Sequence, residues 1–312
     1  MSREPDGGAL RAGPLWFRAA RAAIRQLPVG RFRAFTWLVK VPLPPFEDRL
    51  GDDAGGMAYR CDLRYTANRE MCLTGRYAPR ETALLRALLK PGDTFVDVGA
   101  NLGYFTLVGA AAVGAGGRVV ALEPDPRMAA ELEENVRRNR LAQVHTVRAA
   151  AFDRRGTATL AGYDEDAGNW GVSRLQSAPA SPTTFTVECA PLDDLLDEMG
   201  IEDVPLVKID VEGAEQAVLR GMRAGLARGR YRRVLVELHP WEYADREAAV
   251  REMVEEMEAF GFRGLLADSS PAAVRPALYG RGGLPPMVPF AADTPAAGWP
   301  HVLWALPGSE LS

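Results

Sequence analysis

The chain has 312 residues, of which 47% are hydrophobic and 25% are charged, and its formal net charge is −4. This composition is typical of a globular protein, and the acidic balance argues against a nucleic-acid-binding protein, whose surface is usually basic. The three cysteines, Cys61, Cys72 and Cys189, form no CxxC pair. The sequence therefore suggests neither a zinc site nor a disulfide framework.

The N-terminal segment is basic. Between Gly7 and Phe46 it contains no acidic residue but carries Arg11, Arg18, Arg21, Arg25, Arg31, Arg33 and Lys40. The stretch "PLWFRAARAAIRQL" predicts a helix, with Leu15, Ala19, Ala22, Ala23 and Leu27 on one face and the arginines mostly elsewhere. We expect residues 1–75 to form a helical or mixed extension that acts as a cap or lid. Its arginines are interpreted first as a solvated helix face, and alternatives are contacts with a second copy, an acidic carrier domain, an anionic membrane surface or a phosphorylated substrate.

No stretch of the chain approaches the roughly 20 apolar residues of a membrane span. The Arg-rich N-terminus also lacks the apolar core of a secretory signal. We therefore expect a cytoplasmic protein without stable membrane insertion.

Strands and helices alternate through the rest of the chain, for which we expect one domain over residues 76–312. After a short strand region and a helix within residues 60–92, the apolar runs predict strands at 94–99, 118–123, 143–152, 204–213 and 231–240, with helices at 102–113, 127–139 and 214–227. Continuous apolar runs are typical of strands covered on both faces, so we predict an α/β fold with a mostly parallel, doubly wound sheet. Residues 154–188, rich in Gly, Ser, Pro and Asp, should lie over the carboxyl ends of the strands, and residues 301–308 should form an edge strand.

The turn after the first of these strands reads Gly99-Ala100-Asn101-Leu102-Gly103. A dinucleotide fingerprint needs a second glycine two places after the first, where the pyrophosphate approaches the backbone. Asn101 stands at that place, so the turn disfavours NAD. It still makes a tight turn at the edge of the sheet where ligands bind.

Two acids accompany the turn. Asp97 precedes it, and Glu123 ends the next strand, where an acid commonly accepts both ribose hydroxyls. The pattern indicates a nucleoside without a pyrophosphate and with a cationic part near Asp97. S-adenosylmethionine has these features.

Several motifs extend this interpretation. "FVDVGANLGYFTL", "VVALEPDP", "ENVRRN", "LDDLL", "VKIDVEGAEQAVLRGM" and "VLVELH" occur in this order between Tyr77 and His239. Together they resemble the FkbM family of S-adenosylmethionine-dependent methyltransferases. The resemblance implies a Rossmann-like class I methyltransferase fold. It also implies that Gly99, Asn101 and Gly103 border the methionine part near Asp97, that Glu123 holds the ribose, and that Ala150, Ala151 and Asp153 lie beside the adenine.

A second group of ionisable residues follows two later strands. With a period of two, Lys208 and Asp210 point to one side of their strand, as do Glu237 and His239 of the next. Glu212 follows Asp210 at the turn. The resulting catalytic candidates are Asp210, Glu212, Glu237 and His239.

The roles within this group stay open. His239 is a candidate general base by its intrinsic pKa, and Asp210 with Glu237 could instead hold Mg²⁺. Other interpretations make Glu212 and Glu215 ordinary acids of a helix first turn, Lys208 an ion-pair partner, and His239 an ordinary capping or packing histidine.

Several residues outside this group have separate interpretations. His145 and His301 are interpreted as structural. Trp170 is an aromatic that could stack on an acceptor ring or equally well anchor its own loop, and Tyr77 and Glu81 could close over the cofactor.

The site residues alone indicate a nucleoside-binding α/β enzyme. The family resemblance implies an O-methyltransferase that acts on a hydroxyl of a small molecule, sugar-like or polyketide-like, in natural-product biosynthesis. Alternatives are an N- or carboxyl-methyltransferase on the same fold and a non-catalytic nucleoside-binding protein. The chain reads "DVEG" after the fourth strand instead of the "NPPY" turn that suits amino nitrogen, which disfavours nitrogen as the acceptor.

Overall fold

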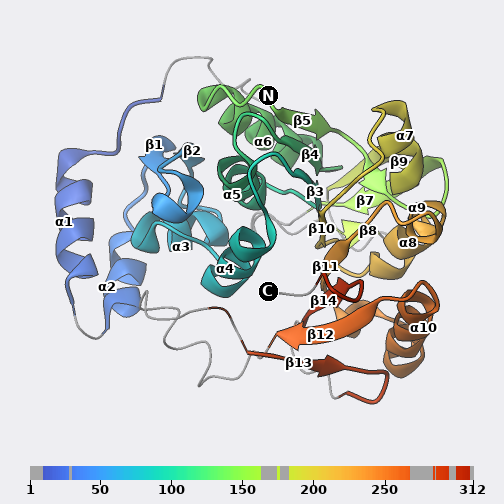
Figure 1. Cartoon of the computed structure of the whole chain (residues 1–312). Helices are drawn as coiled ribbons and strands as arrows, with labels where there is room; N and C mark the ends of the chain where they lie inside the picture. Colours follow the sequence, from blue (N-terminus) through green and yellow to red (C-terminus); the bar gives the residue numbers. More distant parts are fainter. Residues whose placement is uncertain are drawn as a thin grey trace. The chain divides into compact units, whose positions relative to one another are not determined.

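The computed structural model describes residues 10–27, 30–162, 174–175, 183–267, 284, 286–294 and 300–309. The chain divides into two compact units, Met1–Tyr77 and Ala78–Ser312. Figure 1 labels the elements of both. Within the described residues, no helix has the length and apolar character needed to cross a membrane.

The first unit combines helices with a β-hairpin. Its elements are α1 (Leu15–Arg25), α2 (Arg31–Leu38), β1 (Phe46–Arg49), the 3-10 turn η1 (Asp52–Ala54), β2 (Ala58–Cys61) and α3 (Thr66–Thr74). Strands β1 and β2 pair antiparallel, with Phe46 opposite Cys61. The prolines between α2 and β1 lack a backbone donor and so end the helical region.

The buried residue of helix α1 does not belong to its stripe of leucines and alanines. Phe17 is fully buried and its ring lies 5.6 Å from that of Phe46, whereas Leu15 is 80% exposed. Arg21 belongs to the inward side and pairs with Asp48 of β1. The alanine stripe does not set the buried face, because alanines gain little from burial, whereas the large ring of Phe17 gains much more.

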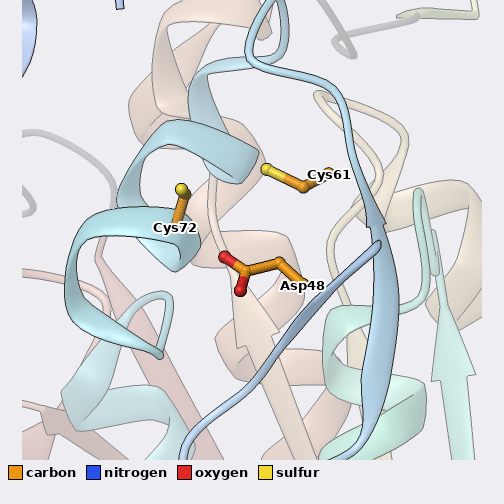
Figure 2. Close-up of side chains that lie close together, drawn as sticks. All are labelled: Asp48, Cys61 and Cys72. Atoms are coloured by element: carbon orange, nitrogen blue, oxygen red, sulfur yellow. The ribbon is translucent and has the colours of Figure 1, made fainter. Parts of the chain in front are cut away.

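Asp48, Cys61 and Cys72 converge in this unit from β1, β2 and α3, as Figure 2 shows. One oxygen of Asp48 and the two sulfurs lie within 4.8 Å of one another. The guanidinium of Arg21 joins them, because it forms an ion pair with Asp48 and its Nη1 lies 3.0 Å from Cys72 Sγ. All three cysteines of the chain are buried free thiols, and burial raises the pKa of the Cys61 thiol well above its usual value.

The second unit contains an eight-stranded sheet in the order β13-β12-β14-β11-β10-β3-β4-β5, which can be followed in Figure 1. The strands are β3 (Thr94–Val98), β4 (Arg118–Leu122), β5 (Val144–Val147), β10 (Leu206–Ile209), β11 (Arg233–Glu237), β12 (Arg263–Ala267), β13 (Met287–Phe290) and β14 (His301–Ala305). The five strands from β5 to β11 pair in parallel. The predicted α/β fold with a mostly parallel, Rossmann-like sheet is confirmed.

Helices cover both faces of this sheet. They are α4 (Pro79–Leu88), α5 (Tyr104–Val113), α6 (Pro126–Arg138), α7 (Leu192–Glu198), α8 (Glu215–Arg220), α9 (Arg223–Ala227), η2 (Pro240–Glu242) and α10 (Arg246–Ala259). Val96 and Val207 pack in one core with Val218 of α8 and Met253 of α10. Phe95 points to the opposite face, where Gly109 of α5 leaves room for its ring.

The last strand, β14, does not lie at the edge of the sheet, where the sequence analysis placed it. It lies inside the sheet, antiparallel to both β11 and β12, and β13 is the edge strand. The prediction placed it at the edge because it did not identify α10, β12 and β13, whose strands extend the sheet beyond β14.

Two further predicted elements are divided in the structure. The strand expected at 143–152 ends at Val147, and Ala150–Ala151 form β6 in a second sheet of order β6-β9-β7-β8, with β7 (Gly156–Ala161), β8 (Arg174–Leu175) and β9 (Thr184–Ala190). The described parts of residues 154–188 are therefore more regular than expected, and Trp170 lies outside the described residues. The helix expected at 214–227 breaks between α8 and α9. At this break a Cβ on Gly221 would lie 2.0 Å from the carbonyl oxygen of Phe152.

Candidate active site

The glycine turn connects β3 to α5 and touches the end of β10. Gly99 has a φ of 82° and, with Ala100, donates its backbone N–H to the carbonyl of Leu122 at the end of β4. A Cβ at Gly99 would lie 1.8 Å from the carbonyl oxygen of Asp210. Only glycine fits this position, and its fit brings the turn directly against Asp210.

Gly103 and Asn101 complete the turn. Gly103 has a φ of 90° and stands immediately before α5, where a Cβ would lie 2.6 Å from Leu132 Cδ1. Asn101 has a φ of 52°, and its Oδ1 accepts the N–H of Leu102 at 2.7 Å. An asparagine tolerates this left-handed backbone because its side chain bonds locally.

Glu123 lies against the turn. Its Oε2 accepts the N–H of Asn101 at 2.7 Å and its Oε1 accepts the N–H of Asp125 at 2.8 Å. Burial raises the pKa of Glu123 to about 8, although the two backbone hydrogen bonds oppose this effect. Each carboxyl oxygen has a second lone pair, so the group can still accept a ligand hydroxyl.

Asp97 is fully buried on β3, and its two oxygens differ. Oδ2 accepts a hydrogen bond from Thr106 at 2.7 Å, whereas Oδ1 has no hydrogen-bond partner among the described residues. Burial raises the pKa of Asp97, and the charge of Lys208 opposes the rise. A buried acceptor without a donor is costly, and a cationic donor of a ligand would satisfy it.

Ala150 and Ala151 follow the end of β5, the strand beside β4. Both are buried, and Ala150 pairs with Cys189 of β9. The carboxylate of Asp153 lies 3.2 Å from Arg154 and 3.7 Å from Arg220. The predicted place of these three residues beside the adenine stays a prediction.

Lys208 and Asp210 form the expected ion pair at the end of β10, with Nζ 2.9 Å from Asp210 Oδ2. Lys208 stands opposite Asp97 in the sheet register, and its ammonium lies 4.4 Å from the centre of the Phe105 ring. Burial alone would raise the pKa of Asp210, but the charges of Lys208 and His239 outweigh it and lower that pKa. Asp210 is therefore an ionised carboxylate at neutral pH.

His239 follows β11 and faces the same carboxylates. Its Nδ1 lies 2.7 Å from Glu215 Oε1, and its Nε2 lies 3.5 Å from Glu212 Oε2, 3.9 Å from Asp210 Oδ1 and 4.0 Å from Glu237 Oε1. Burial lowers the pKa of His239, but the hydrogen bond with Glu215 and the nearby acids outweigh it and raise the value to about 9. Three predicted catalytic residues, Asp210, Glu212 and Glu237, therefore lie around the imidazole of the fourth, His239.

Glu215 is the fully buried partner of this imidazole. Its Oε1 also accepts the N–H of Gly213 at 3.0 Å, and its Oε2 accepts the hydroxyl of Tyr243 at 2.8 Å. Glu215 is the first residue of α8, which agrees with its interpretation as an acid of a helix first turn. Its side chain also bonds to His239 and Tyr243. Tyr243 was not among the predicted site residues. Its position four residues after His239 is the feature of the sequence that could have indicated it.

His301 also belongs to this edge, although the sequence suggested a structural role. Its Nε2 lies 3.2 Å from Glu237 Oε2 and its Nδ1 lies 3.5 Å from Glu81 Oε1. The cause is the register of β14, which sets His301 opposite Glu237. His145, by contrast, lies exposed on β5. The expected closure of Tyr77 and Glu81 over a cofactor stays a prediction.

Comparisons with known proteins identify the family of this chain. Residues 97–263 match the model of the methyltransferase FkbM domain. The chain is 32% identical over 209 residues to the 31-O-demethyl-FK506 methyltransferase FkbM of Streptomyces tacrolimicus, which covers 59% of this chain and 77% of that protein. It is 26% identical over 194 residues to the 2-O-methyltransferase NoeI of Sinorhizobium fredii, covering 57% of this chain and 76% of that protein.

Among solved structures, the chain is similar to the methyltransferase FkbM of Methylobacillus flagellatus KT. The identity is 16% and the TM-score 0.42, with 88% of this chain and 58% of that chain covered. The family match spans more than half of the sequence and includes the glycine turn, Glu123, Asp210 and His239. The chain therefore belongs to the FkbM family and is an S-adenosylmethionine-dependent methyltransferase.

Proposed function

We propose that this methyltransferase acts on a hydroxyl oxygen of a small molecule, sugar-like or polyketide-like, in natural-product biosynthesis. The two similar proteins named above support oxygen as the acceptor, because their names describe O-methylation or an O-demethyl substrate. A cytoplasmic location, and contacts of the basic N-terminal segment with a second copy or a carrier protein, stay predictions.

In this proposal the cofactor lies along the glycine turn. Asp97 Oδ1, the buried oxygen without a partner, accepts the amino group of the methionine part. Glu123 accepts the ribose hydroxyls, and Gly99, Asn101 and Gly103 border the methionine. Ala150, Ala151 and Asp153 adjoin the adenine.

The observation that carries the proposal is the contact between Gly99 and Asp210. Because a Cβ at Gly99 would touch the Asp210 carbonyl, the acidic edge stands directly beside the turn. When a neutral hydroxyl attacks the methyl of the sulfonium, the C–S bond breaks, the O–C bond forms, and the oxygen carries a positive charge until it releases its proton. Carboxylates at this point stabilise that charge and accept the proton.

Among the candidates, the structure favours the carboxylates as bases over His239. The pKa of His239 is raised to about 9, so the ring already holds a proton at neutral pH. We assign the proton-accepting role to Asp210 and Glu237, with Glu212 adding negative charge. His239 then orients these acids through its Nε2.

The first experiment is a titration calorimetry series with S-adenosylmethionine on the wild type and Glu123→Ala, followed by transfer of a labelled methyl group to a panel of hydroxyl, amine and carboxyl compounds. We expect Glu123→Ala to lose about 2 kcal/mol or more of binding free energy, since it removes a buried hydrogen-bonding group.

The bond to the methyl group identifies the acceptor atom. A methyl ether survives mild alkali, a methyl ester does not, and a methylamine gains a basic nitrogen. Label that is released by alkali, or transferred only to amines, would reject the hydroxyl assignment. Absence of cofactor binding would reject the whole proposal.

A further inference from the structure

The side chains around His239 Nε2 have the composition of a metal centre. We propose that Asp210, Glu212 and His239 bind a divalent transition-metal cation, which holds the acceptor hydroxyl beside the methyl group. The second clause rests on the proposed function, whereas the binding site itself does not.

The three ligand atoms lie close enough to share one ion. They are all within 4.8 Å of one another, with Nε2 3.5 Å from Glu212 Oε2 and 3.9 Å from Asp210 Oδ1. Ligands about 2.0–2.2 Å from a common cation are separated by roughly 3–3.5 Å. Small side-chain movements therefore complete the coordination.

The orientation of His239 is an observation separate from the acids. Its Nδ1 is bonded to Glu215 at 2.7 Å, which directs Nε2 toward Glu212 and Asp210. Metal-binding histidines almost always bond their other nitrogen to a carboxylate or carbonyl in this way. Glu215 is fully buried and is fixed in turn by Gly213 and Tyr243.

The two oxygens of Asp210 also have separate partners. Oδ2 lies 2.9 Å from the ammonium of Lys208, and Oδ1 faces His239. Glu237 differs, because its Oε2 is 3.2 Å from His301 and it does not belong to the group of mutually close ligand atoms. We therefore assign Asp210 to the cation and Glu237 to the surrounding shell, and Glu237 is the proton acceptor once the cation occupies Asp210 Oδ1.

The ligand set selects the kind of cation. Magnesium and calcium prefer oxygen ligands alone, whereas an imidazole with carboxylates suits manganese, cobalt or zinc. Binding replaces any proton on Nε2 by the cation. This set differs from the Asp210 and Glu237 pair that the sequence suggested for Mg²⁺.

The test is a titration of the EDTA-treated full chain with Co²⁺, read from its visible absorption, without any methyl acceptor. We expect one tight site per chain, and an affinity at least about 100-fold lower in Asp210→Asn and in Glu212→Gln. Glu237→Gln is the matched control, and its affinity should fall by less than about tenfold. Binding of S-adenosylmethionine by each variant confirms that it is folded.

A second measurement tests the orienting pair. Tyr243→Phe keeps the ring but removes the hydrogen bond to Glu215, and we expect Co²⁺ affinity to fall about tenfold with binding of S-adenosylmethionine unchanged. Equal Co²⁺ affinity in wild type, Asp210→Asn and Glu212→Gln would overturn the site, as would no stoichiometric binding to wild type. Full methyl transfer to hydroxyls by metal-free protein would reject the role of the cation and leave the proposed function intact.

Discussion

Among the described residues, two groups of side chains could hold a metal ion, one in each unit, and they differ in what balances their charge. In the first unit, Asp48, Cys61 and Cys72 are joined by the guanidinium of Arg21. In the second, Asp210, Glu212 and His239 stand among further acids, and the ammonium of Lys208 contacts only one oxygen of Asp210 among the contacts described. In both groups three possible ligand atoms lie within 4.8 Å of one another, but the charges that surround them differ. Because the guanidinium of Arg21 already pairs with Asp48, we interpret the first group as structural. The second group has more carboxylates than cations around it, so it can accept a metal ion, and we call Asp210, Glu212 and His239 the receptive group.

The largest effect we expect concerns the receptive group. Asp210→Asn keeps the shape of the side chain but removes the charge that contacts Lys208 and faces His239. The kcat of methyl transfer should fall by roughly 10³-fold, as loss of a positioned proton acceptor does. The Kd for S-adenosylmethionine, measured by calorimetry, should change less than about threefold. Full activity in this variant would remove the distinction between the two groups.

The next prediction concerns a variant that disrupts the contact between the glycine turn and Asp210. In Gly99→Ala the new methyl would lie 1.8 Å from the Asp210 carbonyl, on a backbone with a φ of 82°. Stability should fall by about 4 kcal/mol or more in urea unfolding, with loss of cofactor binding.

Gly92→Ala is the matched control for that change. Gly92 has a φ of 92°, yet no other group lies within 4 Å of the position that an alanine methyl would take, so only backbone strain of about 1–2 kcal/mol is expected. Similar losses in both variants would show that the close approach to Asp210 has no special importance.

Removing the guanidinium of Arg21 should lower the free energy of unfolding and leave methyl transfer unchanged. Arg21→Met strips Asp48 of its partly buried partner, and we expect the free energy of unfolding to fall by about 2–3 kcal/mol. Arg18→Met, on the exposed side of the same helix, should change it by less than about 0.5 kcal/mol. The double variant Arg21→Met with Asp48→Leu should recover much of the loss, unless the pair contributes nothing to folding.

A separate prediction concerns pH. Because burial raises the pKa of Glu123 from 4.5 to about 8, the stability that this group contributes is fully present below pH 4.5 and is lost as pH rises through 8. The cofactor-free wild type should lose roughly 4–5 kcal/mol across this window. Glu123→Gln, which cannot ionise, should lack this component of the profile. Parallel profiles for the two proteins would contradict the assignment.

Much of the second unit follows from local sequence. The apolar runs at β3, β4, β10 and β11 and the glycine turn between β3 and α5 were predictable, since each is encoded by consecutive residues. The grouping of Asp210 with His239 followed from the period of two and from neighbouring parallel strands.

Other features depend on long-range structure. His301 reaches Glu237 only through the register of β14, which is separated from β11 by α10 and two strands. Glu215 is turned toward His239 because the backbone before it is left-handed, with φ values of 52° at Glu212 and 104° at Gly213. Neither a register nor a turn of this kind can be derived from composition and periodicity. The buried face of α1 depended similarly on one contact, that of Phe17 with Phe46.

The interior position of β14 has a consequence for the order of assembly during synthesis. The ribosome releases β11, β12 and β13 before residues 301–305, so the edge of β11 keeps unpaired backbone groups until the last described strand arrives. The same strand begins with His301, the partner of Glu237. A nascent chain that stalls before this point has its glycine turn but an open sheet and an incomplete acidic edge. The acidic edge is therefore complete only after residues 301–305 have been synthesised and paired with β11.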